Sequence, residues 1–434
     1  MPCRELRYAS KDDWRALNDW LKGRWSPDIS MEQRVRDILA QVREQGDEAL
    51  VDFTRRFDCP DFQAEMIRVP EADLSAALAS IPSEDVAILE AAIGNVRGFH
   101  EQQVQRSWFQ TKPDGTILGQ MVRPVERVGL YVPGGQGGTT PLISSLIMNA
   151  VPAQVAGVDA VAAVSPPRAD GTLDAYILAT AALLGITEVY RLGSAWAVAA
   201  LAFGTGTVPA VDVIAGPGNI YVTTAKRLLV GQVGIDMIAG PSEIAILADA
   251  SAKPEWLAAD MLSQAEHDPL AASILVSDSP SLLDNVKATL SRQLAELPRS
   301  ETAAQSLADW GALILVPDIR VGTELINLLA PEHLELCVDD PWRLLGLIRN
   351  AGAVFMGHHC PEPIGDYFAG PNHVLPTMGT ARFTSGLSVD NFIKKSNIIA
   401  TSCAYVAEHG PAVARLATLE GLDAHARSVT SRLA

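Results

Sequence analysis

The feature that most constrains the fold is a regular alternation of short β-type runs with helical runs, which begins near Arg127. Strands separated by helices of about 10–15 residues are typical of parallel βαβ units with right-handed crossovers. The sequence therefore predicts two successive α/β layers with parallel sheets. The β-type runs of the first layer are residues 128–132, 160–164, 188–191 and 211–214, and those of the second are residues 243–247, 273–276, 312–316, 334–337 and 353–355.

Helical periodicity flanks these two layers. In residues 33–45 the apolar side chains recur at intervals of three and four, which is the spacing of one helix face. We therefore predict helices for the chain before Arg127 and again for the tail from about Asp390. A chain of 434 residues is roughly three times the usual domain length, so more than one domain is expected.

Charge and composition exclude several classes of function. The chain carries 34 basic and 51 acidic side chains, a net charge of −17, so it has no broad basic field for a nucleic acid backbone. No apolar run approaches the roughly 18–20 residues that cross a bilayer, and the first residues lack the apolar stretch of a secretory signal. Five scattered cysteines without a C-x-x-C motif indicate reduced thiols. We expect a cytoplasmic protein that binds neither nucleic acid nor membrane.

Three glycine-rich turns each follow a predicted strand and precede a predicted helix. They are residues 133–140, 192–194 and 216–219. Backbone N–H groups at such a turn can approach the phosphates of a nucleotide, which favours a dinucleotide site. None of the turns matches G-x-G-x-x-G, so a simple tight turn stays open as the alternative for each.

Four of the eight histidines lie in short polar clusters. Gln264 and His267 are three residues apart on a predicted helix, which places an amide oxygen and an imidazole on one face. Asp366 and His425, from two other clusters, complete a set of four nitrogen and oxygen donors suited to a divalent ion of borderline softness. The alternative for each histidine is an ordinary hydrogen-bonded residue.

Glu332 and His333 are adjacent just before a predicted strand. An imidazole titrates near neutral pH and can take a proton from an alcohol, and a neighbouring carboxylate can activate water. This pair is our candidate for acid–base catalysis, with an exposed turn as the alternative. The run His358-His359-Cys360 is interpreted as a loop, because consecutive side chains point in diverging directions.

Read together, these segments resemble the histidinol dehydrogenase family. The resemblance runs from about Arg34 to the end of the chain and rests on long motifs. They are residues 127–135, 213–222, 234–243, 263–267, 331–335, 365–367, 372–377, 383–389 and 420–426.

The resemblance implies two incomplete Rossmann-like domains and a domain-swapped homodimer. It assigns residues 1–29 to an N-terminal helical segment, residues 30–126 and 242–388 to a first α/β domain with the metal and catalytic residues, residues 127–241 to a second, NAD-binding domain, and residues 389–434 to a helical tail on the partner subunit. The implied activity is the four-electron oxidation of L-histidinol to L-histidine through L-histidinaldehyde, with one zinc per subunit and two NAD used in succession, at the end of histidine biosynthesis.

The resemblance also implies roles for individual residues. The catalytic pair is Glu332 and His333. The zinc ligands are Gln264, His267, Asp366 and His425, the last from the partner. The substrate contacts are Ser242, Gln264, His267, His333, Asp366, His373, Glu420 and His425, and the NAD contacts are Tyr131, Trp196 and Asn219.

Two positions depart from the family pattern, both on the nucleotide side. Trp196 stands where the family usually carries Gln, so a hydrogen bond to NAD is replaced by bulk or stacking. The loop at residues 136–140 is longer than usual. Three other interpretations are left open: a related dehydrogenase of another small polyol or amino alcohol, a zinc hydrolase that uses Glu332 and His333 on water, and a catalytically silent binding protein.

Overall fold

The computed structural model describes residues 3–24, 29–134 and 141–433. The loop at residues 136–140 therefore lies outside the described residues. Two compact units make up the chain. The first contains Met1–Gln103 and Glu126–Phe392, and the second contains Val104–Val125 and Ile393–Ala434.

A parallel five-stranded sheet forms one layer of the first unit, and its order is β6-β5-β4-β7-β8. The chain runs from β4 to one edge and then reverses, so the order switches between β4 and β7. Helices α6 to α9 connect the strands. The bounds are β4 Arg127–Tyr131, α6 Ile143–Ala156, β5 Ala160–Ser165, α7 Ala175–Leu183, β6 Glu188–Arg191, α8 Ser194–Phe203, β7 Val213–Ala215, α9 Ile220–Leu229 and β8 Gly234–Ile235.

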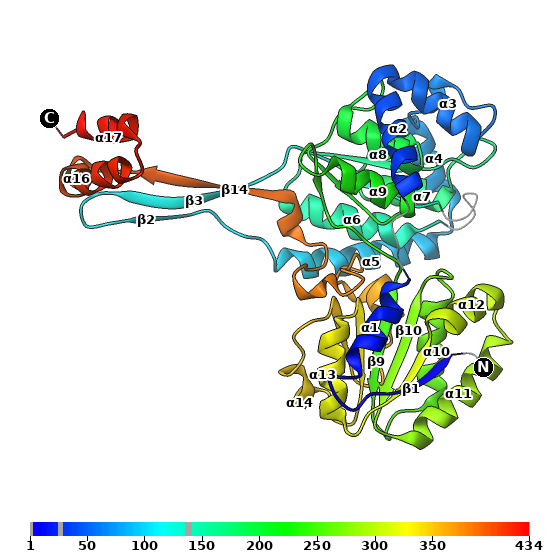
Figure 1. Cartoon of the computed structure of the whole chain (residues 1–434). Coiled ribbons are helices and arrows are strands. Elements are labelled where there is room, and N and C mark those ends of the chain that lie inside the picture. The colour runs from blue at the N-terminus through cyan, green and yellow to red at the C-terminus, as the bar shows by residue number, and fades with distance from the viewer. Residues whose placement is uncertain (1–2, 25–28, 135–140, 434) are drawn as a thin grey trace. The chain divides into compact units, whose positions relative to one another are not determined.

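The N-terminal helices pack on this five-stranded layer (Figure 1). Helix α2 (Ile29–Gln45) contacts α8 and α9, and α3 (Asp47–Phe57) contacts α8. On the other face α4 (Glu71–Ser80) contacts α7 and α5 (Ser83–Glu101) contacts α6, and a 3-10 turn, η1, spans Ala64–Met66. These contacts place the helices on the first series of strands, whereas the resemblance assigned residues 30–126 to the domain of the second series; α5 also contacts η3 (Gly365–Ala369), which follows the second series.

A parallel six-stranded sheet forms the other layer, with the order β1-β11-β10-β9-β12-β13. Here the order switches between β9 and β12. The strands are β1 Arg4–Arg7, β9 Glu243–Ala248, β10 Ala272–Ser277, β11 Ala312–Leu315, β12 His333–Cys337 and β13 Ala353–Met356. The N-terminal segment was predicted to be helical, but it begins with β1, which pairs with β11 before α1 starts.

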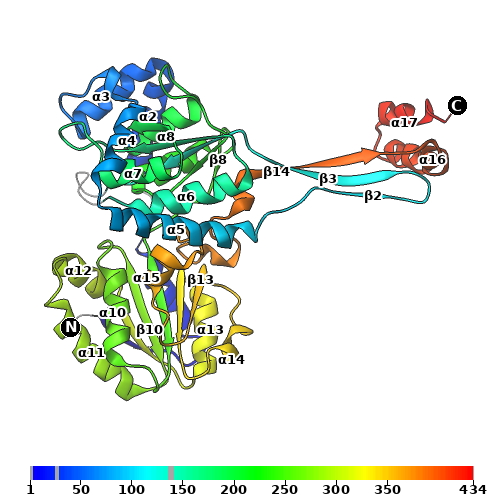
Figure 2. The ribbon, with the colours of Figure 1, turned by 180° about the vertical axis from the view of Figure 1, so that it is seen from behind.

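Helices cover both faces of the six-stranded sheet (Figure 2), because alternate side chains of each strand point to opposite faces. Ile244 and Ile246 join the apolar cluster under α10, α11 and α12, whereas Ala245 and Leu247 join the cluster under α1 and α13. The bounds are α1 Trp14–Lys22, α10 Pro254–Ala265, α11 Pro280–Leu294, α12 Ser300–Trp310, α13 Ile319–Leu329 and α14 Trp342–Leu345. After β13 come short segments, namely α15 Glu362–Ile364, a π-helical turn η3 Gly365–Ala369, η4 Thr380–Arg382 and η5 Val389–Phe392.

The second unit is an antiparallel three-stranded sheet with two helices. Its strand order is β14-β3-β2, with β2 Trp108–Thr111, β3 Ile117–Pro124 and β14 Ile393–Ala400. Helices α16 (Cys403–Leu419) and α17 (Asp423–Thr430) pack on each other. The sequence predicted helix both before Arg127 and from about Asp390, so the three strands are a correction to that prediction. Among the helices of the described residues, none is long and apolar enough to cross a membrane.

Trp196 lies in the core of the five-stranded layer. Its ring is only 4% exposed and stacks on the rings of Phe53 and Phe57, each at a centroid distance of 5.6 Å. The indole N–H is buried, and no described residue accepts a hydrogen bond from it. This packing gives Trp196 a structural role, and its predicted contact with NAD has no support from it.

We expect Trp196→Ala to lower the free energy of unfolding by about 3–5 kcal/mol, because it removes a large buried ring and leaves a cavity. Trp196→Phe should cost less, since it keeps an aromatic ring in the stack and loses only part of the indole together with the unpaired N–H. Urea denaturation of both variants checks this. As a control, Trp342→Ala, at a residue 72% exposed, should change stability by less than about 0.5 kcal/mol. Normal stability of Trp196→Ala would contradict the core role.

Candidate active site

Polar side chains gather where the six-stranded sheet switches direction. His333 is the first residue of β12, Glu332 precedes it, and Glu243 begins the neighbouring strand β9. These residues lie at the amino ends of parallel strands. Ligands in open α/β sheets usually bind at the carboxyl ends, so this site departs from the common arrangement.

The backbone of Glu243 bonds to both members of the predicted catalytic pair. Its N–H donates to Glu332 Oε2 at 2.9 Å, and its carbonyl oxygen lies 3.1 Å from His333 Nδ1. A carbonyl can only accept, so Nδ1 carries the hydrogen and Nε2 of a neutral ring keeps its lone pair. The two backbone polar groups of one residue, Glu243, therefore orient the carboxylate and select the tautomer of the imidazole.

Arg24 holds Glu243 from the N-terminal segment. Its guanidinium forms an ion pair with the Glu243 carboxylate and also contacts Met378 Sδ. The arginine side chain is 1% exposed and the glutamate side chain is 13% exposed. A pair withdrawn this far from water constrains the start of β9, because breaking it would leave a buried charge uncompensated.

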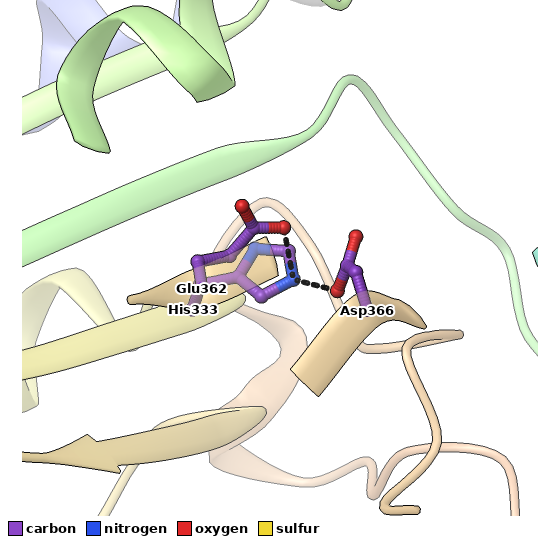
Figure 3. A group of neighbouring side chains, drawn as sticks. All are labelled: His333, Glu362 and Asp366. Atoms are coloured by element: carbon purple, nitrogen blue, oxygen red, sulfur yellow. Dashed lines mark ion pairs between the residues drawn. The ribbon is translucent and has the colours of Figure 1, made fainter. Parts of the chain in front are cut away.

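The opposite side of the imidazole faces two further carboxylates (Figure 3). His333 Nε2 lies 3.6 Å from Asp366 Oδ1 and 3.9 Å from Glu362 Oε1, and it has no hydrogen-bond partner among the described residues. Oxygens of both carboxylates and an imidazole nitrogen lie within 4.8 Å of one another. Ser263 donates to Glu362 Oε2 at 3.2 Å. This grouping suits a cation or a protonated substrate.

Burial and mutual charge shift the pKa values of this group. Burial raises the pKa of Glu332 to about 7, against the opposing effect of His333. Burial alone would lower the pKa of His333, but the Glu332, Asp366 and Glu362 carboxylates raise it to about 10. Burial also raises the pKa of Glu362, to about 8, with Asp366 adding to the effect. The pKa of Asp366 falls despite its burial, because His333 and His373 stabilise its charge.

Two of the predicted zinc ligands lie at the end of α10. Gln264 is 1% exposed, and its side-chain oxygen is buried with no hydrogen-bond partner in the described part of the chain. Helix α10 ends at Ala265, two residues before His267. The expectation that Gln264 and His267 share one face of a helix is therefore met only in part, because His267 lies in the turn that follows, where its N–H donates to the Gln264 carbonyl oxygen. His267 is exposed at its surface, but the protein atoms around the imidazole remove part of its hydration and so lower its pKa. The negative charge of Asp366 acts in the opposite direction.

The other predicted contacts are divided between the units. Ser242 directly precedes β9 and is partly buried, and His373 Nδ1 lies 3.0 Å from the Asp366 carbonyl oxygen. Glu420 and His425 belong to the second unit, where both are exposed. The close group of titratable side chains around Asp366 contains His333 and Glu362, which were not among the predicted ligands.

Three residues of this site were missed by sequence reasoning, namely Glu362, Glu243 and Arg24. Glu362 is buried and lies four residues before Asp366, and an acid at helical spacing from a predicted ligand could have indicated it. Glu243 acts through its backbone, which no residue type signals.

A cavity of about 450 Å³ adjoins the site. Asp366 and His373 form part of its wall, and apolar side chains such as Phe99, Phe355 and Leu387 form much of the rest. A pocket that is mainly apolar with a few convergent polar groups is the usual form of a small-molecule site.

The residues predicted to contact NAD lie around the switch point of the five-stranded sheet. Tyr131 ends β4 and is buried, and its hydroxyl accepts a hydrogen bond from the Ser194 N–H at 3.0 Å. Asn219 follows β7, is exposed, and caps α9 by accepting from the N–H groups of Tyr221 and Val222. Carboxyl ends of strands at a switch point are where such sheets bind dinucleotides.

Comparisons with known proteins show which family this chain resembles in sequence and in fold. The sequence model of a family described as histidinol dehydrogenase matches residues 24–433. A histidinol dehydrogenase of Nitratidesulfovibrio vulgaris is 62% identical over 432 residues, covering 100% of this chain and 99% of the relative. One from Oleidesulfovibrio alaskensis is 60% identical over 433 residues and covers 100% of both chains. The crystal structure of histidinol dehydrogenase from Elizabethkingia anophelis matches with a TM-score of 0.93 at 34% identity, covering 100% of this chain and 98% of that one.

The raised pKa of Glu332 makes stability depend on pH. In the unfolded chain the carboxyl titrates near its ordinary value of 4.5, and in the folded protein near 7. Between these values the folded state binds more protons, so stability falls as pH rises. Glu332→Gln removes this loss. We expect the variant to be more stable than the wild type by up to about 3 kcal/mol near pH 8, with the difference vanishing towards about pH 4.

Urea denaturation across this pH range measures the effect. The exposed Glu296→Gln is the matched control and should show no such pH dependence. A constant difference between wild type and Glu332→Gln would mean that the carboxyl titrates normally in the folded protein.

Proposed function

This chain belongs to the histidinol dehydrogenase family, and on that basis we propose that it oxidises L-histidinol to L-histidine with two molecules of NAD. The observation that carries the proposal is the Glu332–His333 pair, which the backbone of Glu243 orients beside Asp366. A buried base with a fixed tautomer next to an acidic group is what the oxidation of a cationic amino alcohol requires.

Zinc is the metal we propose for this chain, held by Gln264, His267, Asp366 and the His425 of a second subunit. The unpaired buried oxygen of Gln264 supports this, because such an acceptor otherwise carries an uncompensated desolvation cost. Nitrogen and oxygen donors also match the preferences of zinc. When bound, zinc supplies a Lewis acid that holds nitrogen atoms of the substrate, and NAD accepts the hydride.

His333 removes the hydroxyl proton of histidinol in the first half-reaction. In the neutral form of the ring, which acts as the base, Nε2 is the free nitrogen, since Nδ1 donates to the Glu243 carbonyl. A cation held at Asp366 would favour this form, because it would oppose the carboxylates that raise the pKa of His333 to about 10. The alcohol loses this proton and a hydride, and it becomes the aldehyde. The neighbouring carboxylates stabilise the imidazolium that results, as the raised pKa of His333 indicates.

Glu332 acts in the second half-reaction. A carboxyl group with a pKa of about 7 is partly ionised near neutral pH and can take a proton from water. Addition of that water to the aldehyde gives the hydrate, which loses a second hydride and a proton to form the carboxylic acid. The overall change is four electrons, two per NAD.

We also propose a homodimer in which the second unit of one subunit serves the site of the other. Two observations support tail exchange. Glu420 and His425 belong to the second unit, whereas Gln264, His267 and Asp366 belong to the first. That unit also exposes large apolar side chains, a pattern typical of a surface that a partner covers. They include Trp108, Phe109, Ile399, Leu416 and Leu419.

The stoichiometry of the purified protein tests the proposed reaction. We expect two NADH and one histidine for each histidinol consumed, loss of this activity with a chelator, and recovery with zinc. A strong preference for another alcohol would identify a different dehydrogenase. Turnover without NAD would identify a hydrolase and contradict the proposal.

Complementation tests tail exchange. His333→Ala and His425→Ala should each be inactive as homodimers, because each removes a proposed site residue from both sites. A heterodimer purified through two different tags combines an intact His333 with the intact His425 of the other chain in one of its two sites. We expect it to show about half of the wild-type activity. If each tail served its own subunit, neither site would be intact and the heterodimer would be inactive.

A further inference from the structure

We infer that Lys226 and Asp236 are positioning residues for the dinucleotide, acting as a buried ion pair that fixes the turn at residues 216–219. This inference rests on the proposed use of NAD. Neither residue is among the predicted NAD contacts. Their role is inferred from their hydrogen bonds to Gly216.

The turn occupies the switch point of the five-stranded sheet. It joins β7 to α9, and Gly216 lies against the backbone of Tyr131 at the end of β4. Gly216 has a φ of 120°, and a Cβ there would lie 2.1 Å from the Tyr131 carbonyl oxygen. Only glycine allows this approach. The backbone of Gly216 therefore lies directly against the end of β4, at the switch point where a dinucleotide is expected.

The ion pair engages both polar groups of Gly216. Lys226 Nζ donates to the Gly216 carbonyl oxygen at 2.9 Å, and Asp236 Oδ2 accepts from the Gly216 N–H at 2.8 Å. The ammonium and carboxylate also pair with each other, and Asp236 Oδ1 accepts from the Met237 N–H at 2.6 Å. Lys226 comes from α9 and Asp236 follows β8, so the two sides of the turn are tied to different elements.

Burial argues that the pair serves to position the turn. Lys226 is 3% exposed and Asp236 is 9% exposed. The desolvation of two such charges offsets much of their attraction, and apolar residues of similar volume often give equal stability. A gain in stability is therefore a weak reason for the pair. What apolar residues cannot do is bond to both the N–H and the carbonyl oxygen of Gly216 at the same time.

The consequence for binding is specific. The side chains of Lys226 and Asp236 are too buried to contact a ligand, so their loss acts through the turn that carries Asn219. We expect weaker binding of the dinucleotide, with little change in the zinc and substrate residues of the other sheet.

The test compares three full-length variants: Lys226→Met, Asp236→Asn, and the double variant Lys226→Met/Asp236→Leu. The dissociation constant of NADH, measured by fluorescence, should rise about tenfold or more in each, and the KM for NAD should rise with it. The kcat at saturating NAD, the KM for histidinol and the zinc content should stay within about twofold of the wild type.

The double variant separates positioning from stability. A single variant leaves one buried charge unpaired and can fail to fold, whereas removal of both charges should restore stability close to that of the wild type. The inference requires that NADH binding remain weak in this stable variant. NADH affinity within about twofold of the wild type in the folded double variant would overturn it.

Arg127→Met is the matched control. Arg127 pairs with Glu188 in the same sheet, but at the starts of β4 and β6, the edge opposite the turn. We expect a loss of stability with unchanged NADH affinity, and an equal loss of affinity would overturn the inference. Because NADH binding is measured directly, a wild type that binds NADH but does not oxidise histidinol would refute the proposed function and leave this comparison valid.

Discussion

The candidate site depends on the backbone of one residue, Glu243, at the start of β9. The N–H of Glu243 binds the Glu332 carboxylate and its carbonyl oxygen fixes the hydrogen of the His333 imidazole. The parallel pairing of β9 with β12 sets the distance between these groups, and the buried ion pair with Arg24 holds the glutamate in place. Catalytic orientation is thus a property of the sheet, which is more rigid than a loop.

The same device occurs in both sheets of the first unit. At each switch point one residue uses both its N–H and its carbonyl oxygen, Glu243 in one sheet and Gly216 in the other. A buried ion pair supports each of these residues. Arg24 pairs with the Glu243 side chain, and Lys226 pairs with Asp236 beside Gly216. The edges differ, since the catalytic group lies at the amino ends of its strands and the predicted dinucleotide site at the carboxyl ends of its own. The fold therefore separates the chemistry of the substrate from the binding of the nucleotide.

The sequence was sufficient to predict those elements that depend on residues close together in the chain. The predicted strand at residues 188–191 and β6 coincide, and the adjacent polar pair at the start of β12 was predicted to be catalytic. Long-range pairing was not readable, so β1 and β14 were predicted as helix. Glu243 and Gly216 act through backbone atoms that carry no side-chain signal. Trp196 was interpreted by its position in a motif, but its ring turns into the core against Phe53, which depends on packing that the motif does not contain.

The sheet of the second unit has a consequence for the order in which a growing chain can fold. Strand β3 pairs with β14, and the contact between Gln120 and Asn397 joins residues 277 apart. During synthesis β2 and β3 emerge long before their neighbour, so β3 presents an open edge until the ribosome has added almost all remaining residues. A prematurely terminated product would keep that edge unpaired, and chaperones would have to shield it from association with other nascent chains.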